Sequence, residues 1–321
     1  MNKPIAIVAG EPNSISSEII FKSWKLKKKY IHNSFFIIGN INLLNLQKKK
    51  LNYKIRIKEI DLNFNKNDLK GPDLPVINID YKQKKAFEKI SNKSAKYIIK
   101  SFDVAIKLAK NKKIVGFINC PISKENLFKN KYQGITEFLS KKSNTYGNEV
   151  MLIYNKNLSV SPITTHIPLN TVSSKISKSI IVKKVKIINN FFKNNFKIKP
   201  NFAILGFNPH NYSPSQNSEE KKYINNAVKF LKKNKIKVLG PIPADTSFVI
   251  AKKYKFDVII GMYHDQVLTP FKAIYKYDAI NVTLGLPFIR VSPDHGIAKN
   301  ITGKGIANPN SLIESIKFFN K

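Results

Sequence analysis

Short apolar runs alternate with longer amphipathic segments along most of the chain. Continuous apolar runs at residues 4–10, 34–39 and 114–120 are typical of strands buried on both faces of a parallel sheet. By the same criterion, further strands are predicted at residues 202–208, 238–243, 256–263 and, as one long stretch, 279–291. Between the strands, apolar residues recur at the three-to-four spacing of an amphipathic helix. Helices are therefore predicted at residues 17–29, 82–110, 177–194, 218–233, after residue 245 and at 311–319.

The alternation of strands and helices predicts an α/β fold with a largely parallel sheet. In such folds, ligands bind beyond the carboxyl ends of the strands. Several short motifs follow predicted strands, namely Gly10–Pro12, Cys120–Pro121, Asn208–His210 and Tyr263–Asp265. A boundary between two lobes fits the turn at residues 120–124, and no linker marks it more sharply. No G-x-G-x-x-G follows the first strand, so a Rossmann dinucleotide site is not expected.

The composition is that of a folded protein. With 321 residues, 42% of them hydrophobic, the chain can form one large or two medium domains. No stretch approaches the length of a membrane span, so no membrane association is expected. The N-terminal apolar run is too short for the core of a signal peptide. The lone Cys120 excludes an internal disulfide and fits a reducing compartment, so a cytoplasmic protein is expected.

The formal net charge of +36 raises the hypothesis of a nucleic-acid partner, because basic surfaces release counterions from phosphates. The positive charge is nevertheless spread along the whole chain, and Arg56 and Arg290 are its only arginines. Sites that read bases or grip phosphates favour the planar fork of arginine over lysine. The charge therefore favours a solvated lysine surface, and no specific nucleic-acid partner is expected.

Three of the five histidines follow predicted strands, in the sequences TTHIP, NPHN and MYHDQ, and these are His166, His210 and His264. Imidazole is the commonest metal ligand, and three protein ligands with one open position form the usual catalytic zinc site. The alternative is three unrelated histidines, each satisfied by a local hydrogen bond. The three lie far apart and match no short metal motif, so spacing alone leaves both interpretations open.

The segments after His264 add further candidate groups. Asp265 could ligate or orient a metal, and Lys272 could offer a cation to an anionic substrate. Asn281 and Arg290 stand out as polar residues in the apolar run that follows. Arg290 is informative because this chain uses lysine for nearly all its cations, and bidentate recognition of phosphate or carboxylate needs the guanidinium fork. An ordinary ion pair is the alternative for Arg290.

A series of motifs runs nearly end to end along the chain, and none of them is specific alone. In order they are GEP, CPISK, GITEFL, TTHIPL, GFNPH, GPIPADTSF, GMYHDQVLTPFK, NVTLGLPFIRVSPDHG and ITGKG. Taken together, they resemble the 4-hydroxythreonine-4-phosphate dehydrogenase family, the NAD-dependent enzymes of pyridoxine 5′-phosphate biosynthesis. The resemblance implies a two-lobed α/β/α architecture similar to that of isocitrate and isopropylmalate dehydrogenases. The first lobe would comprise residues 1–125 with about 300–321, and the second lobe residues 126–299.

The resemblance also implies cofactors, partners and roles for particular residues. A divalent metal, zinc, magnesium or cobalt, would be bound at a site shared between the subunits of a homodimer by His166, His210 and His264. The phosphorylated substrate would be contacted by Thr136, Lys272, Asn281 and Arg290. Asp265 and Lys272 are the candidate catalytic residues, and Asp265 would either orient a metal-bound histidine or transfer a proton. NAD or NADP would accept the hydride, and no residues are assigned to it.

The implied reaction is oxidation of 4-phosphooxy-L-threonine to 2-amino-3-oxo-4-phosphooxybutanoate, which decarboxylates to 3-amino-2-oxopropyl phosphate in pyridoxal phosphate biosynthesis. The chain departs from the family pattern at Ile135, where a substrate-contacting histidine is usual, and in the loops at residues 13–17 and 211–218. These changes keep open a related dehydrogenase of another phosphorylated hydroxy acid, such as a phosphothreonate. A more distant alternative is a lysine-rich nucleic-acid-binding protein on an α/β scaffold.

Overall fold

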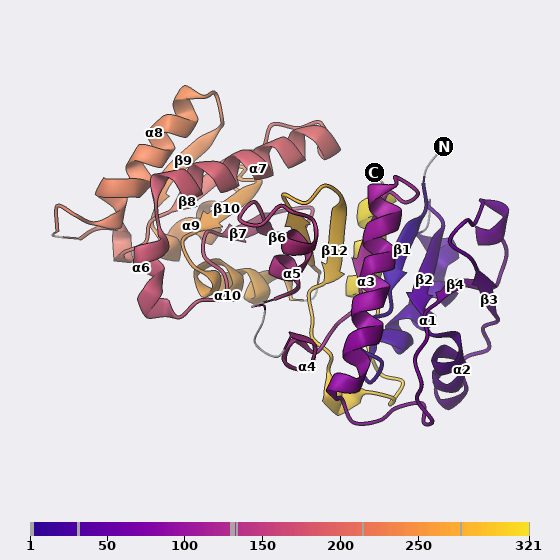
Figure 1. Ribbon diagram of the computed structural model, residues 1–321. Helices are drawn as coiled ribbons and strands as arrows, with labels where there is room; N and C mark the ends of the chain where they lie inside the picture. Colours follow the sequence, from indigo (N-terminus) through magenta and orange to yellow (C-terminus); the bar gives the residue numbers. More distant parts are fainter. Residues whose placement is uncertain are drawn as a thin grey trace. The chain divides into compact units, whose positions relative to one another are not determined.

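The chain divides into two compact units, which are drawn in Figure 1. Unit 1 comprises Met1–Ile135 and Pro287–Lys321, and unit 2 comprises Thr136–Leu286. The lobe boundaries were expected near residues 125 and 299, so the segment from residue 287 onward belongs to unit 1 earlier than expected. The computed structural model describes residues 3–30, 33–128, 132, 134–213, 215–276 and 278–320.

The strands of unit 1 form a parallel sheet. They are β1 (Ile5–Val8), β2 (Phe35–Gly39), β3 (Ile57–Ile60), β4 (Leu74–Asn78), β5 (Gly116–Asn119) and β12 (Ile289–Pro293). Their order is β3-β4-β2-β1-β5-β12, and every neighbouring pair is parallel.

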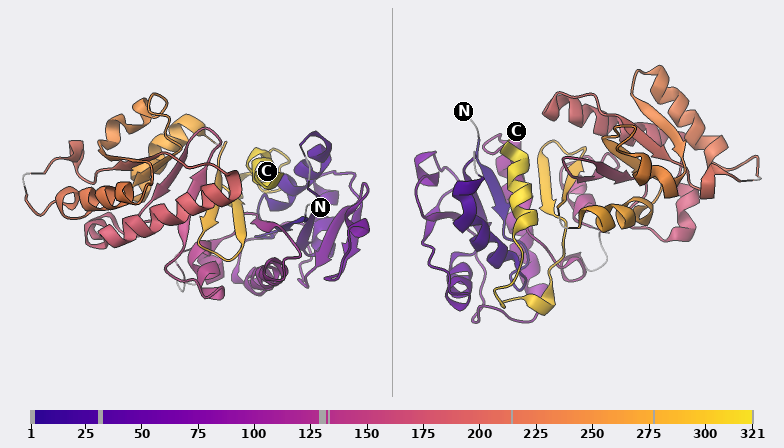
Figure 2. Two further views of the ribbon diagram at one scale, coloured as in Figure 1. Left: turned by 90° about the horizontal axis from the view of Figure 1, so that it is seen from above. Right: turned by 180° about the vertical axis from the view of Figure 1, so that it is seen from behind.

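Helices cover both faces of the unit 1 sheet (Figures 1 and 2). Helix α3 (Ala95–Lys110) packs on β1, β2 and β5 on one face, and α1 (Ser16–Leu26) packs with α11 (Asn310–Lys317) on the other. The other α-helices of the unit are α2 (Ile41–Lys50) and α4 (Lys124–Phe128). Single 3₁₀ turns occur at Lys27–Lys29, Asn67–Leu69, Asn92–Ser94, Lys299–Ile301 and Phe318–Asn320.

The sheet of unit 2 is mixed. Its strands are β6 (Val150–Tyr154), β7 (Ser159–Pro162), β8 (Phe202–Leu205), β9 (Val238–Ile242), β10 (Val258–Gly261) and β11 (Ile280–Leu284). In the order β11-β6-β7-β10-β8-β9, strand β6 is antiparallel to both of its neighbours. Strands β7, β10, β8 and β9 are parallel to one another. The predicted α/β fold with a largely parallel sheet is confirmed in both units.

The longer helices of unit 2 include α7 (Lys178–Phe196) and α10 (His264–Tyr275). Helix α7 packs with α8 (Asn225–Lys233), whereas α10 packs on β7 and β10 and beside α9 (Ala244–Ile250). The remaining helical segments are α5 (Ile135–Lys142), α6 (Val172–Lys175), the 3₁₀ turns η4 (Leu169–Thr171) and η5 (Pro209–Asn211), and the π-helix η6 (Glu220–Ile224).

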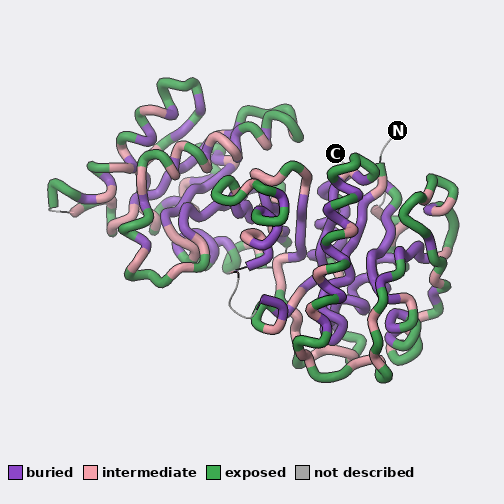
Figure 3. The backbone as a smooth tube through the Cα atoms, viewed as in Figure 1, coloured by how far each residue is buried: buried purple, intermediate pink, exposed green. Residues whose placement is uncertain are grey.

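The strands form the core, and loops and outer helix faces are exposed (Figure 3). All residues of β1 and β2 are buried, as their continuous apolar sequences predict. In unit 2, Val267 and Phe271 of α10 belong to the same buried cluster as Val160 of β7 and Ile259 of β10. This packing fixes α10, whose first residue is His264, on the strands beneath it. Within the described residues, no helix combines the length and apolar character of a membrane span.

The helix predicted from residue 82 in fact begins at Ala95. The segment before it is held by tertiary hydrogen bonds to Asn13. Gln83 and Asn13 exchange side-chain bonds of 3.2 and 2.9 Å, and the Glu88 N–H donates to Asn13 Oδ1 at 2.7 Å. Because these bonds fix the backbone in a non-helical path, they override the apolar spacing of the segment.

Two other predicted elements are each divided in the structure. The helix predicted at 218–233 starts with the π-helix η6 before it continues as α8. The apolar stretch at 279–291 forms two strands, β11 and β12, rather than one. They are separated at Gly285, which has φ +82° and where a Cβ would lie 2.0 Å from Asn148 O. Only glycine fits that conformation and that close approach, so the chain turns there.

Candidate functional site

The three candidate metal ligands follow three adjacent parallel strands of unit 2. His166 follows β7, His210 follows β8, and His264 follows β10. Strand β10 pairs with β7 on one side and with β8 on the other. The carboxyl ends of parallel strands lie at one edge of a sheet, so the topology brings all three histidines to the same edge.

The imidazoles of His166 and His264 lie close together, with ring centroids 5.7 Å apart. Two imidazoles that share a metal have centres roughly 5 Å apart, because metal–nitrogen bonds are about 2 Å long. His264 Nδ1 lies 2.7 Å from Asp265 Oδ1. A carboxylate only accepts hydrogen bonds, so Nδ1 carries the hydrogen and the lone pair remains on Nε2. This carboxylate–imidazole pair is the usual support of a metal-binding histidine.

His210 has a similar carboxylate partner but a different orientation. Its Nδ1 lies 3.7 Å from Asp245 Oδ2, and its side chain is 79% exposed. Its backbone is left-handed, with φ +54°. Within the described part of a single chain, no group of three or more His, Cys, Asp or Glu side chains is arranged to hold a metal. In chemical type, the donors present fit a divalent transition metal, and His166 and His264 are the two already close together.

Hydrogen bonds hold the backbone beneath the histidines. Thr164, two residues before His166, donates from its backbone N–H and from Oγ1 to Met262 O, at 3.1 and 2.8 Å. Met262 stands two residues before His264. On the other side of the same loop, Lys184 of α7 donates to Ile163 O at 2.7 Å. The turns that carry His166 and His264 are therefore tied directly to each other.

Two glutamates hold the turn that leads to His210. Glu220 Oε1 accepts from the backbone N–H groups of Phe207 and Asn208, both at 2.8 Å. The Asn208 amide donates to Glu219 Oε2 and Glu220 Oε2 at 3.0 and 2.8 Å. Burial alone raises the pKa of Glu220, but the hydrogen bonds from Asn208 and Phe207 outweigh it and hold this pKa below its ordinary value. The pKa of Glu219 is lowered in the same way, partly by a hydrogen bond from Ser173 Oγ.

The candidate substrate residues divide between the units. Thr136, Lys272 and Asn281 belong to unit 2, where Thr136 Oγ1 lies 3.3 Å from Thr283 Oγ1. Asn281 and Thr283 share one face of β11, since side chains two apart on a strand point the same way. Asn281 Oδ1 is buried and has no hydrogen-bond partner in the described chain, so an acceptor stands ready there. Sequence reasoning missed Thr283, although it lies two residues after Asn281.

Arg290 lies in β12 of unit 1, and only 1% of it is exposed. Its Nε donates to Asn119 Oδ1, at the end of β5, at 2.6 Å. The sequence left open an ion pair or an anion-binding role, and the structure adds a hydrogen bond inside the unit. Lys272, in contrast, is exposed on α10.

The first loop of unit 1 is filled by its own side chains. Glu11, 1% exposed, accepts from Ser94 Oγ and from the Asn13 N–H, and burial raises its pKa. Gly10 has φ +75°, and a Cβ there would lie 2.5 Å from Pro121 O. Two serines of this loop are hydrogen-bonded to each other as well, with Ser14 Oγ 2.8 Å from Ser16 Oγ. Asn13, in the loop that departs from the family pattern, therefore has an internal structural role.

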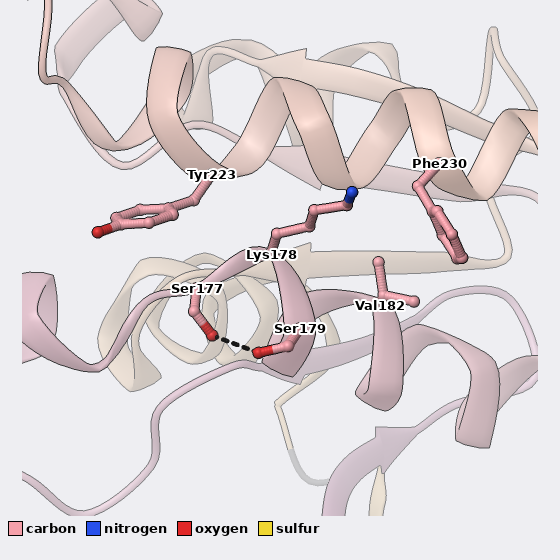
Figure 4. A pocket seen from close by; sticks show the side chains of 6 residues that line it. All are labelled: Ser177, Lys178, Ser179, Val182, Tyr223 and Phe230. Carbon is pink, nitrogen blue, oxygen red and sulfur yellow. Dashed lines mark hydrogen bonds between the residues drawn. The ribbon is translucent and has the colours of Figure 1, made fainter.

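A cavity of about 430 Å³ lies in unit 2 away from the histidines (Figure 4). It opens between the start of α7 and the η6–α8 segment, and Lys178 extends across it between Tyr223 and Phe230. The wall is largely apolar, and none of the candidate site residues lines it. Its other lining residues are Ser177, Ser179 and Val182.

The chain has relatives along its whole length. A family model described as "Pyridoxal phosphate biosynthetic protein PdxA" matches residues 31–319. A 4-hydroxythreonine-4-phosphate dehydrogenase of Sulfurihydrogenibium sp. is 40% identical over 319 residues, which covers 98% of this chain and 96% of that protein. The crystal structure of 4-hydroxythreonine-4-phosphate dehydrogenase from Klebsiella pneumoniae is similar with a TM-score of 0.85 and 27% identity, covering 99% of this chain and 97% of that one.

A more distant structural relative concerns the fold alone. A β-decarboxylating dehydrogenase from Thermococcus kodakarensis is similar with a TM-score of 0.50 and 12% identity, covering 98% of this chain and 81% of that one. The expected likeness to the isocitrate and isopropylmalate dehydrogenase architecture is confirmed at the level of the fold.

Proposed function

The chain belongs to the PdxA family of pyridoxal phosphate biosynthetic proteins, and from this premise we propose that it is a metal-dependent 4-hydroxythreonine-4-phosphate dehydrogenase. The substrate would be 4-phosphooxy-L-threonine, oxidised at its secondary alcohol with transfer of hydride to NAD or NADP. The product, 2-amino-3-oxo-4-phosphooxybutanoate, is a β-keto acid and would lose carbon dioxide to give 3-amino-2-oxopropyl phosphate. The observation that carries this proposal is the position of His166, His210 and His264 after three adjacent parallel strands, with the rings of His166 and His264 5.7 Å apart.

The three histidines would hold a divalent metal. Imidazole ligands favour zinc or cobalt over magnesium, so we place these two metals first. Such an ion, when bound, lowers the pKa of a coordinated hydroxyl and so eases loss of its proton. Asp265 keeps the Nδ1 hydrogen of His264 in a hydrogen bond, and the lone pair of Nε2 would thereby be available to a metal. Of the two roles left open for Asp265, this geometry favours orientation of His264.

The substrate would be held by Thr136, Lys272, Asn281 and Arg290. Thr136, whose Oγ1 lies 3.3 Å from Thr283 Oγ1, and Asn281, whose buried Oδ1 has no hydrogen-bond partner in the described residues, would contact polar groups of the substrate. Lys272, two turns along α10 from His264, would offer its ammonium to the phosphate or carboxylate. Arg290, whose Nε donates to Asn119, would offer its guanidinium to an anionic group of the substrate. Fixing the substrate at several points sets the reacting carbon against the nicotinamide and supplies the entropic part of the rate enhancement.

A homodimer would complete the site. In the described residues of one chain the three histidines do not form a single metal-binding group, and His210 is turned toward Asp245. A partner subunit would close the site and exclude water from it. Gel filtration with light scattering tests this assembly directly, and a monomer that turns over substrate at full rate would contradict it.

An absorbance assay for NADH or NADPH tests the function itself. Turnover of 4-phosphooxy-L-threonine that is lost on adding a chelator and restored by zinc or cobalt is the expected result. A phosphothreonate serves as the parallel substrate, because Ile135 stands where the family has a histidine. Preference for the phosphothreonate would assign the chain to a related dehydrogenase, and absence of turnover of either substrate by the metal-loaded protein would overturn the proposal.

A further inference from the structure

A buried glutamine, Gln266, lies between two of the histidine turns. It is 9% exposed and stands in the first turn of α10, two residues after His264. Its Nε2 donates to Gly206 O at 2.8 Å, and its Oε1 accepts from the Met262 N–H at 2.7 Å. Gly206 directly follows β8, and Met262 directly follows β10. One side-chain amide therefore joins the ends of the two strands that lead to His210 and His264.

The surroundings leave this amide little freedom. A Cβ at Gly261 would lie 3.1 Å from Gln266 Oε1 and 2.5 Å from Val267 Cγ1, so glycine is needed for the approach. Gly206 is itself held, because its N–H donates to Ile242 O of β9 at 3.0 Å. The bond from Gln266 to Gly206 O thus ends on a backbone that cannot easily follow a displaced partner.

One side chain on each side of β10 links the turn of His264 to the turn of a neighbouring histidine. On one side of β10, Thr164 ties the His166 turn to Met262 O. On the other side, Gln266 ties the Met262 N–H to the His210 turn. Among the side-chain hydrogen bonds described above, those of Gln266 are the ones that link the His264 turn to the His210 turn.

We propose that Gln266 is the positioning residue that sets the spacing of His264 and His210 for the metal. The inference rests on the proposed function, since it needs those histidines to share an ion. Gln266 touches neither the metal nor the substrate in this assignment, and it acts by holding the two backbones. Supporting residues of this kind typically change metal affinity by about 10- to 100-fold when they are replaced.

The test compares two buried glutamines of the same chain. Gln47 of α2 is 2% exposed, and its Nε2 donates to Pro12 O and Ala86 O at 2.7 and 3.0 Å. Like Gln266, it links two backbone segments, but it lies in unit 1 and far along the sequence from the histidines. Gln266→Met and Gln47→Met each remove a buried amide of similar size, so their effects on folding should be comparable while their effects on metal should differ.

The measurements are titration of the apo full-length protein with Co²⁺, read from the visible absorption of the bound ion, and urea unfolding without metal. Gln266→Met is expected to raise the Kd for Co²⁺ by about 10- to 100-fold and to alter the absorption band, because the ligand geometry changes. Gln47→Met is expected to leave the Kd and the band unchanged. Gln266→Glu keeps the acceptor for Met262 and the side-chain size but loses the donor to Gly206 O, so a rise in Kd of the same order is expected, and it serves if Gln266→Met does not fold.

Each other outcome has a distinct meaning. A Kd within twofold of wild type and an unchanged band for both Gln266 variants would overturn the positioning role. If the wild type still turned over 4-phosphooxy-L-threonine in that case, the proposed function would stand without it. No Co²⁺ binding and no turnover by the wild type would overturn the positioning role and the proposed function together.

Discussion

At the carboxyl ends of their parallel strands, the two units carry loops of opposite character. In unit 1, the loop after β1 closes on the turn after β5, with the Glu11 N–H donating to Pro121 O at 2.9 Å. Its polar residues Glu11 and Asn13 are buried, and the Glu11 carboxylate accepts from the backbone N–H of Asn13. In unit 2, the equivalent edge carries exposed His166 and His210 and the half-exposed His264.

This difference separates two uses of polar residues at the same place in a fold. In unit 1 the polar side chains of the loop make hydrogen bonds within the loop and are buried at the carboxyl edge of the sheet. In unit 2 the backbone is satisfied by other residues, such as Thr164 and Gln266, which leaves the imidazoles at the surface. A position at the end of a strand therefore predicts where a ligand can bind. Whether a ligand binds there depends on whether the polar side chains are already used in internal hydrogen bonds.

The largest effect is expected from removing one imidazole of the unit 2 edge. His264→Ala should abolish bound metal and lower turnover by about a thousandfold or more, because a Lewis-acid metal supplies several kcal/mol. Metal content per subunit and the NADH assay check this. His32, which lies outside the described residues and has no assigned role, is the control. Equal losses in His32→Ala and His264→Ala, with metal content unchanged in both, would contradict the metal site.

Arg290 tests whether unit 1 contributes a substrate contact as well as packing. Arg290→Lys removes the fork and should raise the Michaelis constant for the phosphorylated substrate about 10- to 100-fold, since a hydrogen bond to a charged group contributes about 1.5–3 kcal/mol. The Michaelis constant for the dinucleotide should change little. Asn119→Ala is the companion variant, because it breaks the internal hydrogen bond and keeps the guanidinium. An unchanged Michaelis constant for the substrate in Arg290→Lys would contradict a substrate contact and leave Arg290 with a structural role alone.

Two buried glutamates, one in each unit, should respond to pH in opposite directions. The pKa of Glu220 lies below the ordinary 4.5, so the carboxylate stabilises the fold above about pH 4.5, and this contribution is lost as pH falls through its folded-state pKa. Glu220→Gln should cost about 1 kcal/mol at pH 7, because neutral hydrogen bonds are weaker than charge-assisted ones. The gap between this variant and wild type should close on acidification.

The contribution of Glu11 to the stability of the fold changes with pH in the opposite direction. Its pKa is raised by burial, so its charged form destabilises the fold at neutral pH, and wild type regains stability as pH falls through that pKa toward 4.5. Glu11→Gln should therefore be at least as stable as wild type at pH 7, with the difference shrinking on acidification. Urea unfolding of both variants from pH 4 to 8 measures this, and parallel pH profiles for Glu11→Gln and Glu220→Gln would contradict the contrast.

The smallest effect is expected at Ile135, which ends the first segment of unit 1 and is 7% exposed. Ile135→His restores the family histidine, and a new charge-assisted hydrogen bond would contribute about 1.5–3 kcal/mol. Burying an imidazole at this position costs a similar amount, about 1–3 kcal/mol. Catalytic efficiency should therefore stay within about threefold of the parent. A large gain would show that the site was weakened by the isoleucine and not rebuilt around it.

Much of the fold could be predicted because it rests on local patterns. Continuous apolar runs located strands such as β1, β8 and β10, and the strand-end rule placed the three histidines at one edge. Strand β6 was not predicted, and β7 was predicted only as a strand of undefined bounds before His166, because it is short and carries Ser159 and Ser161. Their position in the sheet depends on pairing with β10 and β11, which are distant in sequence.

The supporting residues of the site could not be assigned from sequence for a related reason. Gln266 lies inside the MYHDQ motif, and Glu220 lies two residues after the divergent loop at residues 211–218. Their partners, however, are backbone groups of Gly206, Met262 and Phe207, and any residue type can supply a backbone group. Such contacts leave no pattern in the partner sequence, so they appear only when the chain is folded.

The π-helix η6 makes the unit 2 edge unusually sensitive to the length of the chain. A π turn arises where one extra residue is accommodated within a helix. Each residue of an α-helix turns the chain by about 100°. Deleting one residue from Glu220–Ile224 would let α8 run on as a regular helix and rotate Glu219 and Glu220 by about that angle relative to its buried face. Variation among natural relatives should therefore favour substitutions here and exclude single-residue deletions.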